Sequence, residues 1–295
     1  MTGGLIIDKP EGWTSHDVVA RTRRLAGTRR VGHTGTLDPF ATGVLVLCIG
    51  SATRLSSLIV GHEKEYLATM RLGWATDTQD RTGARVGDVA ALESIPSDPE
   101  TISRALEAMS GEQEQLPPMY SAKKVDGRAL HTHARAGREV ERKPVRIRAH
   151  LELAGPVRRN EDGTVDVDFR VTCSAGTYVR TLAHDLGARL GCGAHLDALR
   201  RTRVGRFTLS DAATLEALEG HVEERLVPPA ALVADLPSRR LDEGEARAIR
   251  YGQAVPAGDV TASGDCALLD SEGALVGIGA LDPATGLVRP RIVLA

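Results

Sequence analysis

Residues 32–43 read Gly32-His33-Thr34-Gly35-Thr36-Leu37-Asp38-Pro39-Phe40-Ala41-Thr42-Gly43, and the apolar run Val44–Ile49 follows them directly. Three glycines and a proline in so short a stretch preclude a regular helix and predict an ordered loop. The apolar, β-branched run that ends before Gly50 predicts a central strand. Asp38 precedes a proline, so its backbone favours extended conformations. Its carboxylate is therefore expected on a rigid loop at the start of a buried strand, where catalytic groups commonly lie. The alternative is an aspartate that only caps a turn.

The neighbouring sequence predicts a mixture of strands and helices around this loop. Strands are expected at residues 5–7, 66–72, 145–153 and 165–171, the last of which alternates strictly. Helices are expected after Thr14 or Ser15 as N-cap and at 99–109, 129–135 and 177–190. Because strands and helices do not alternate regularly, we expect an α+β fold with a mixed, largely antiparallel sheet.

A change in composition near Val227-Pro228-Pro229 and Leu236-Pro237 predicts a separate C-terminal piece. A short helix at 243–251 and three strands near 266–270, 274–281 and 287–294 are expected there. The predicted organisation is therefore a large domain at 1–235 and a small β domain at 236–295, the latter near the lower size limit for independent folding.

The bulk composition is that of a soluble globular protein, with 42% hydrophobic and 26% charged residues in a chain of 295. The N-terminus lacks a basic segment and a long apolar run, and charges interrupt every apolar stretch, so neither a signal peptide nor a membrane span is expected. The four cysteines are widely spread without a C-x-x-C pair. These features predict a reducing, cytoplasmic environment.

The charge is unevenly distributed although the net charge is only −2. Residues 120–150 contain nine basic and three acidic side chains, and residues 1–60 and 176–206 are also basic in balance. The acidic residues concentrate at 77–115 and 211–247. A basic face for a polyanion such as a nucleic acid is one interpretation. The other is a set of solvated charges scattered over the surface.

The loop at 32–43 resembles the catalytic motif of the TruB family of tRNA pseudouridine synthases. Further segments resemble the family's motifs in the family's order, namely Asp8-Lys9-Pro10 with Ser15–Val19, Lys64-Glu65-Tyr66, Leu72–Asp80, Pro117–Lys124, Cys173–Leu182 and Ala194–Gly205. The resemblance covers residues 4–210, and the C-terminal piece resembles a PUA-like RNA-binding domain more loosely. It implies a pseudouridine synthase catalytic domain with an RNA-gripping insertion at about 112–148. The sequence departs from the family pattern at His131, where relatives often have tyrosine. This difference affects only the packing of the insertion.

The resemblance also implies a role for each candidate residue. Asp38 is the expected catalytic nucleophile, Arg180 its ion-pair partner, and Tyr66 the residue that stacks on the flipped uracil and handles the C5 proton. The expected substrate-binding residues are His33, which fills the gap left by the flipped base, Tyr178 and Leu199, which line the base pocket, and Asp80, which contacts an RNA base. Without the resemblance, these would be interpreted as a surface arginine, a locally bonded loop histidine and ordinary buried side chains.

The implied reaction is the isomerisation of the T-loop uridine of tRNA, position 55 in tRNA numbering, to pseudouridine after base flipping. A carboxylate can divide this task through a covalent intermediate, by attack on either the sugar or the base. The reaction needs no redox change, phosphate donor or metal, so no cofactor is expected. His131 and His133 are two residues apart on a predicted helix and would point away from each other, which argues against a metal site.

The expected partner is the T stem-loop of tRNA, bound by a monomer without an obligate protein partner or a membrane. Three alternatives are a synthase acting on another RNA with a guide, a tRNA-folding chaperone, and a nucleoside glycosidase. Glycosidases usually use two carboxylates that flank the bond, and these motifs contain no second one.

Overall fold

A computed structural model describes residues 1–87, 90–125, 127–258 and 264–294. Asp126 of the predicted insertion lies outside the described residues. The chain divides into two compact units. The first unit comprises Met1–Leu37, Leu45–Gly61 and Ser210–Ala295, and the second comprises Asp38–Val44 and His62–Leu209. The expected boundary at residue 235 follows sequence composition and stays a prediction.

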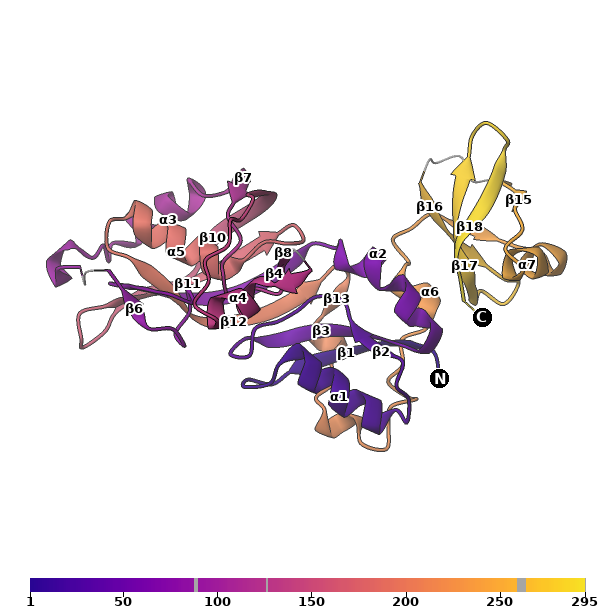
Figure 1. Cartoon of the computed structure of the whole chain (residues 1–295), viewed down its shortest axis with the longest axis horizontal. Coiled ribbons are helices and arrows are strands. Elements are labelled where there is room, and N and C mark those ends of the chain that lie inside the picture. Colours follow the sequence, from indigo (N-terminus) through magenta and orange to yellow (C-terminus); the bar gives the residue numbers. More distant parts are fainter. Residues whose placement is uncertain (88–89, 126, 259–263, 295) are drawn as a thin grey trace. The chain divides into compact units, whose positions relative to one another are not determined.

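The second unit contains a sheet in the order β12-β4-β11-β10-β7, visible in Figure 1. These strands are Ala194–Val204 (β12), Lys64–Leu72 (β4), Val165–Cys173 (β11), Val145–Arg159 (β10) and Gly111–Gln115 (β7). All four neighbouring pairs are antiparallel. The start of β3 (Thr42–Ile49) adds a parallel pairing to β12 at Thr42 and Gly43. The α+β class and the mixed, largely antiparallel sheet are thereby confirmed.

Helices and short strands complete the second unit. Helix α3 (Pro99–Glu107) lies against β10, and α5 (Val179–Arg189) lies against β12. Its remaining elements are β5 (Ala75–Thr76), β6 (Arg85–Val86), η2 (Leu92–Ser94), β8 (Lys124–Val125), β9 (Arg128–Ala129), α4 (Leu130–Arg135) and β13 (Phe207–Thr208). Gly187 fits only as glycine, because an added Cβ would lie 2.2 Å from the nitrogen of Ala194. This close approach brings α5 onto the start of β12.

The N-terminal part of the first unit surrounds the apolar strand β3. Strand β1 (Gly3–Lys9) and strand β2 (Val31–His33) both pair with β3, and every residue of β3 after Thr42 is buried. Helix α1 (Ser15–Leu25) begins at the N-cap Thr14, with Asp17 completing a capping box. The other elements here are η1 (Gly50–Leu55), α2 (Ser56–Val60), η3 (Leu209–Asp211), η4 (Glu216–Leu218) and α6 (Pro229–Leu232).

The C-terminal residues form a small β domain with its own core. Its sheet has the order β14-β16-β17-β18-β15, with strands Ser238–Arg240, Asp265–Leu269, Leu275–Asp282, Leu287–Val293 and Val255–Pro256 (Figure 1). Helix α7 (Glu243–Arg250) places Ile249 against Leu268, Val276 and Val288. This arrangement confirms the expected PUA-like β domain.

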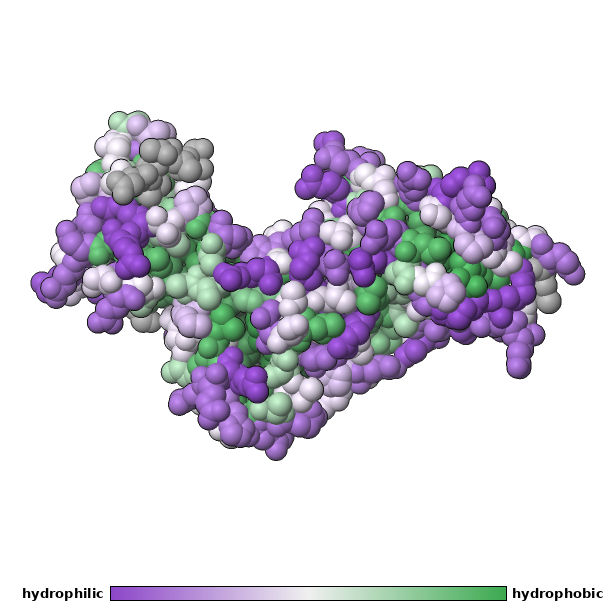
Figure 2. All heavy atoms as spheres, turned by 180° about the vertical axis from the view of Figure 1, so that it is seen from behind, coloured by the Kyte–Doolittle hydropathy of each residue, from purple (hydrophilic) through white to green (hydrophobic). Residues whose placement is uncertain are grey.

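Hydrophilic residues cover much of the face seen in Figure 2. Within the described ranges, every helix is too short or too polar to traverse a lipid bilayer. The four cysteines are buried free thiols.

Candidate active site

Asp38 and Arg180 form the centre of the candidate site, within the second unit. Arg180 Nε donates to Asp38 Oδ2 at 2.8 Å, and Arg180 Nη2 donates to Asp38 Oδ1 at 3.2 Å. The arginine side chain is 4% exposed and the aspartate side chain 32% exposed. A two-point pair of this kind fixes the orientation of the carboxylate and favours its charged form. The pair therefore presents a partly accessible carboxylate in a fixed orientation, as a nucleophile requires.

Local backbone geometry positions each partner of this pair. The carbonyl of Asp38 accepts the amide of Ala41 at 3.1 Å, so the loop turns at Pro39 and then enters β3. Arg180 lies in the first turn of α5, whose N-cap is Tyr178. Gln115 at the end of β7 bonds to both backbone groups of Tyr178, at 2.8 and 3.0 Å. The start of α5 is thereby tied to the sheet.

Asp80 is a second carboxylate near Arg180, and the residue is 5% exposed. Its Oδ2 is 3.4 Å from Arg180 Nη1, while its Oδ1 accepts hydrogen bonds from Thr78 and Thr82. Gln79, in the same turn, has φ of +64°, a strained conformation for a residue with a side chain. The turn supports the buried arginine from the side opposite Asp38. The expected contact of Asp80 with an RNA base stays a prediction.

Tyr66 lies on the central strand β4 and is 8% exposed. Its direct cross-strand neighbours are Val171 on β11 and Arg201 on β12. Burial raises the pKa of the Tyr66 phenol, and a hydrogen bond and positive charge from Arg201 oppose that rise. The negative charge of Asp38 also acts on the phenol, which places the two groups in the same electrostatic environment.

Tyr178 and Leu199 belong to the same unit but to different elements. Tyr178 is half-buried at the start of α5, where burial raises the pKa of its phenol and the positive charge of Arg180 opposes the rise. Leu199 is 7% exposed on β12, opposite Ala68 of β4. The second unit thus contains the carboxylate, its arginine and the three expected pocket residues.

His33 belongs to the first unit and is described there. It ends β2, its Nδ1 accepts the amide of Gly35 at 3.4 Å, and its ring meets His16 edge-on at 5.3 Å between centroids. Its expected role beside the flipped base stays a prediction.

Two features of this site were missed by sequence reasoning. Arg201 is 2% exposed and its Nε donates to the carbonyl of Val44 at 2.6 Å, although it occurs in a run of surface-type residues. Lys64 is 6% exposed, and burial together with the charge of Arg201 lowers the pKa of its amino group to about 8. Lys64 lies two residues from Tyr66 on the same face of β4, whereas only the pairing of β12 with β4 reveals that Arg201 is beside Tyr66.

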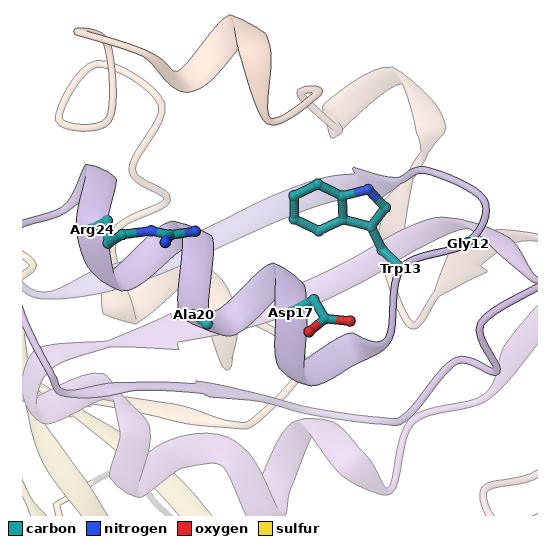
Figure 3. A pocket seen from close by; sticks show the side chains of 5 residues that line it. All are labelled: Gly12, Trp13, Asp17, Ala20 and Arg24. Carbon is teal, nitrogen blue, oxygen red and sulfur yellow. The ribbon is translucent and has the colours of Figure 1, made fainter.

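A surface depression of about 450 Å³ lies in the first unit, along α1 (Figure 3). Its lining residues are Gly12, Trp13, Asp17, Ala20 and Arg24. Asp17 is already bound to the backbone and hydroxyl of Thr14 at 2.9 and 2.6 Å. The candidate catalytic residues do not line this depression, so we do not identify it with the active site.

The model of the TruB family pseudouridylate synthase N-terminal domain matches residues 23–179. A model of the tRNA pseudouridylate synthase B C-terminal domain matches residues 180–230. This chain belongs to the TruB family. It is 47% identical to the tRNA pseudouridine synthase B of Thermobifida fusca, over 99% of this chain and 98% of that protein. It is 41% identical to the enzyme of the same name from Ralstonia pickettii, over 98% and 93% of the two chains.

Solved structures agree with this family assignment. The crystal structure of a Cbf5-Nop10-Gar1 complex contains a chain that superposes with a TM-score of 0.69 and 28% identity, covering 94% of this chain and 78% of that one. A chain of the archaeal box H/ACA sRNP Nop10-Cbf5 complex superposes with a TM-score of 0.70 and 25% identity, covering 99% and 86%. The α+β fold of the TruB family therefore extends over nearly the whole chain.

Proposed function

We propose that this protein isomerises the T-loop uridine of tRNA, position 55, to pseudouridine, with Asp38 as the nucleophile. The observation that carries the proposal is the two-point ion pair between Asp38 and the buried Arg180, in a member of the TruB family. Full-length relatives named tRNA pseudouridine synthase B support tRNA as the substrate.

The chemistry requires one glycosidic bond to be exchanged for another. The bond between N1 of uracil and C1′ of ribose breaks, and a bond between C5 and C1′ forms. C5 loses its proton and N1 gains one, so the product is an isomer of the substrate. A transient covalent bond to Asp38, through the sugar or the base, divides the barrier and is broken before release.

The other residues act on the extruded base. We infer that Tyr66 stacks on the uracil and handles the C5 proton, while Tyr178 and Leu199 line the base pocket. Arg180 keeps Asp38 ionised and oriented. His33 fills the space that the flipped nucleotide leaves. The burial of Tyr66 and Leu199 supports a pocket that excludes water.

We further infer that the enzyme works in the cytoplasm as a monomer without an obligate protein partner. The insertion at about 112–148 would hold the T stem-loop through its phosphates, because its exposed basic residues suit a polyanion. The bacterial relatives named as tRNA-modifying enzymes support the cytoplasmic location.

Tritium release from C5-labelled, unmodified tRNA transcript tests the proposal. We expect release by the wild type, mapped to the T-loop uridine, and none above background by Asp38→Asn, with tRNA affinity retained. The matched control is Glu223→Gln, which removes an exposed carboxylate outside the insertion and should react like the wild type. Tight tRNA binding without release by the wild type would refute the enzymatic function and favour an RNA chaperone.

A further inference from the structure

Tyr66 and Arg201 are direct neighbours on paired strands. Their Cα atoms are register partners across β4 and β12, and both side chains are buried, at 8% and 2% exposure. Cys173 and Lys64 also act on this cluster electrostatically, and Asp38 acts on the phenol. A charged guanidinium is costly to bury without well-placed hydrogen bonds. Its position beside the phenol therefore calls for an explanation.

Two contacts hold the guanidinium in place. Arg201 Nε donates to the carbonyl of Val44 at 2.6 Å, which anchors the group to β3 within the second unit. Arg201 also shares a hydrogen bond with the phenol of Tyr66. A guanidinium has only donors, so the phenol oxygen must be the acceptor. The phenolic hydrogen is consequently directed away from Arg201.

We propose that Arg201 is a positioning residue for the isomerisation, which holds the Tyr66 phenol against the flipped base by donating a hydrogen bond to its oxygen. The inference rests on the proposed function of Tyr66. With its oxygen held by Arg201, the phenol keeps one fixed position against the reacting base. The adjacent positive charge also lowers the cost of negative charge on the phenol oxygen during proton movement.

A purely architectural role is the competing explanation, because Arg201 also connects β12 to β3 through Val44. The two roles differ in their dependence on the Tyr66 hydroxyl. If Arg201 acts through that hydroxyl, removing the hydroxyl should also remove most of the effect of changing Arg201. An architectural role predicts the same loss of rate with or without the hydroxyl.

The test is a double-mutant cycle of single-turnover rates at saturating enzyme, for wild type, Tyr66→Phe, Arg201→Met and the double variant. We expect Tyr66→Phe to slow the reaction by about 10²- to 10⁴-fold, the range for a proton-handling group. Arg201→Met should give a loss of similar size, but only about a twofold further loss in the Tyr66→Phe background. The dissociation constant for tRNA should stay within about twofold of the wild type in all four proteins.

Two further variants keep the test decisive. Arg201→Lys retains a buried donor and should recover part of the rate lost in Arg201→Met. If Arg201→Met does not fold, Arg201→Lys replaces it in the double-mutant cycle. Arg206→Met, which changes an exposed arginine just after β12, should leave the rate near that of the wild type. Equal rate losses from the Arg201 change in both Tyr66 backgrounds would overturn the inference while leaving the proposed function intact. A wild type without activity would instead overturn the proposed function.

Discussion

Arg180 uses all three of its nitrogens in fixed contacts. Besides the two bonds to Asp38, Nη1 donates to the carbonyl of Thr78 at 2.7 Å and Nη2 donates to the carbonyl of Tyr120 at 2.8 Å. Asp80 adds a second carboxylate at 3.4 Å from Nη1. The arginine thus ties Asp38, the proposed nucleophile, to two loops at once. Its planar fork is suited to this task, whereas a lysine has a single nitrogen.

Arg180→Lys should therefore lower the isomerisation rate even though it conserves the charge. Loss of the two-point hold on Asp38 corresponds to about 3 kcal/mol, or roughly a 100-fold slower single-turnover reaction. The affinity for tRNA should change little, because the side chain is buried. Arg189→Lys is the control, since Arg189 ends the same helix and contacts only a carbonyl at 3.5 Å among the described hydrogen bonds. A rate for Arg180→Lys within about threefold of that control would contradict the assigned role.

At the scale of elements, the junction of β3 with β12 depends on one glycine. Gly43 has φ of +99°, and a Cβ added there would lie 2.2 Å from the carbonyl oxygen of Arg201. Gly43→Ala should cost about 2–5 kcal/mol of unfolding free energy, from backbone strain and the clash together. Gly27→Ala isolates the strain, because Gly27 also has positive φ but nothing within 4 Å of an added Cβ. Gly27→Ala should lower the free energy of unfolding, measured by urea denaturation, by about 1 kcal/mol. An equal loss in Gly43→Ala would refute a steric role for Gly43.

The elements also show how far sequence reasoning extends. The apolar run of β3 and the strict alternation of β11 predicted strands correctly, because burial on one or both faces leaves a clear pattern. Strand β10 continues to Arg159, beyond the expected end at Leu153, although Gly155 and Pro156 are residue types that normally indicate a turn. Strand β12 was not predicted at all, since two register shifts and four consecutive polar residues at 200–203 hide its period.

The site shows the same limit. Asp38 and Arg180 were paired before the structure by family resemblance, and the structure brings them together. Composition alone would have left both as ordinary surface charges. The contact between Tyr66 and Arg201 depends on the register of β4 with β12, which a residue pattern does not specify for a strand containing bulges. The family resemblance therefore indicated the candidate reacting groups, whereas the supporting Arg201 became apparent only from the strand register.

At the scale of the whole molecule, the net charge is only −2, but the basic residues are grouped in blocks. The salt dependence of tRNA affinity should therefore test whether such a block binds RNA phosphates. The hairpin of β8 and β9 carries Lys124 and Arg128, both exposed, within the basic block at 120–150. If they contact phosphates of the T stem-loop, each contributes about one unit to the slope of log affinity against log salt. Lys124→Gln with Arg128→Gln should therefore weaken tRNA binding at low salt and reduce the slope by about 2.

The rate at saturating enzyme should be nearly unchanged in this double variant, because the substitutions affect binding rather than the reacting groups. Arg225→Gln is the matched control, since it removes an exposed positive charge from the acidic segment at 211–247 and should leave the slope as in the wild type. Filter binding across a salt series measures the tRNA affinity of the wild type, the hairpin double variant and Arg225→Gln. An unchanged slope in the hairpin variant would mean that these two charges are merely solvated, and the RNA-gripping role would then have to lie elsewhere in the insertion.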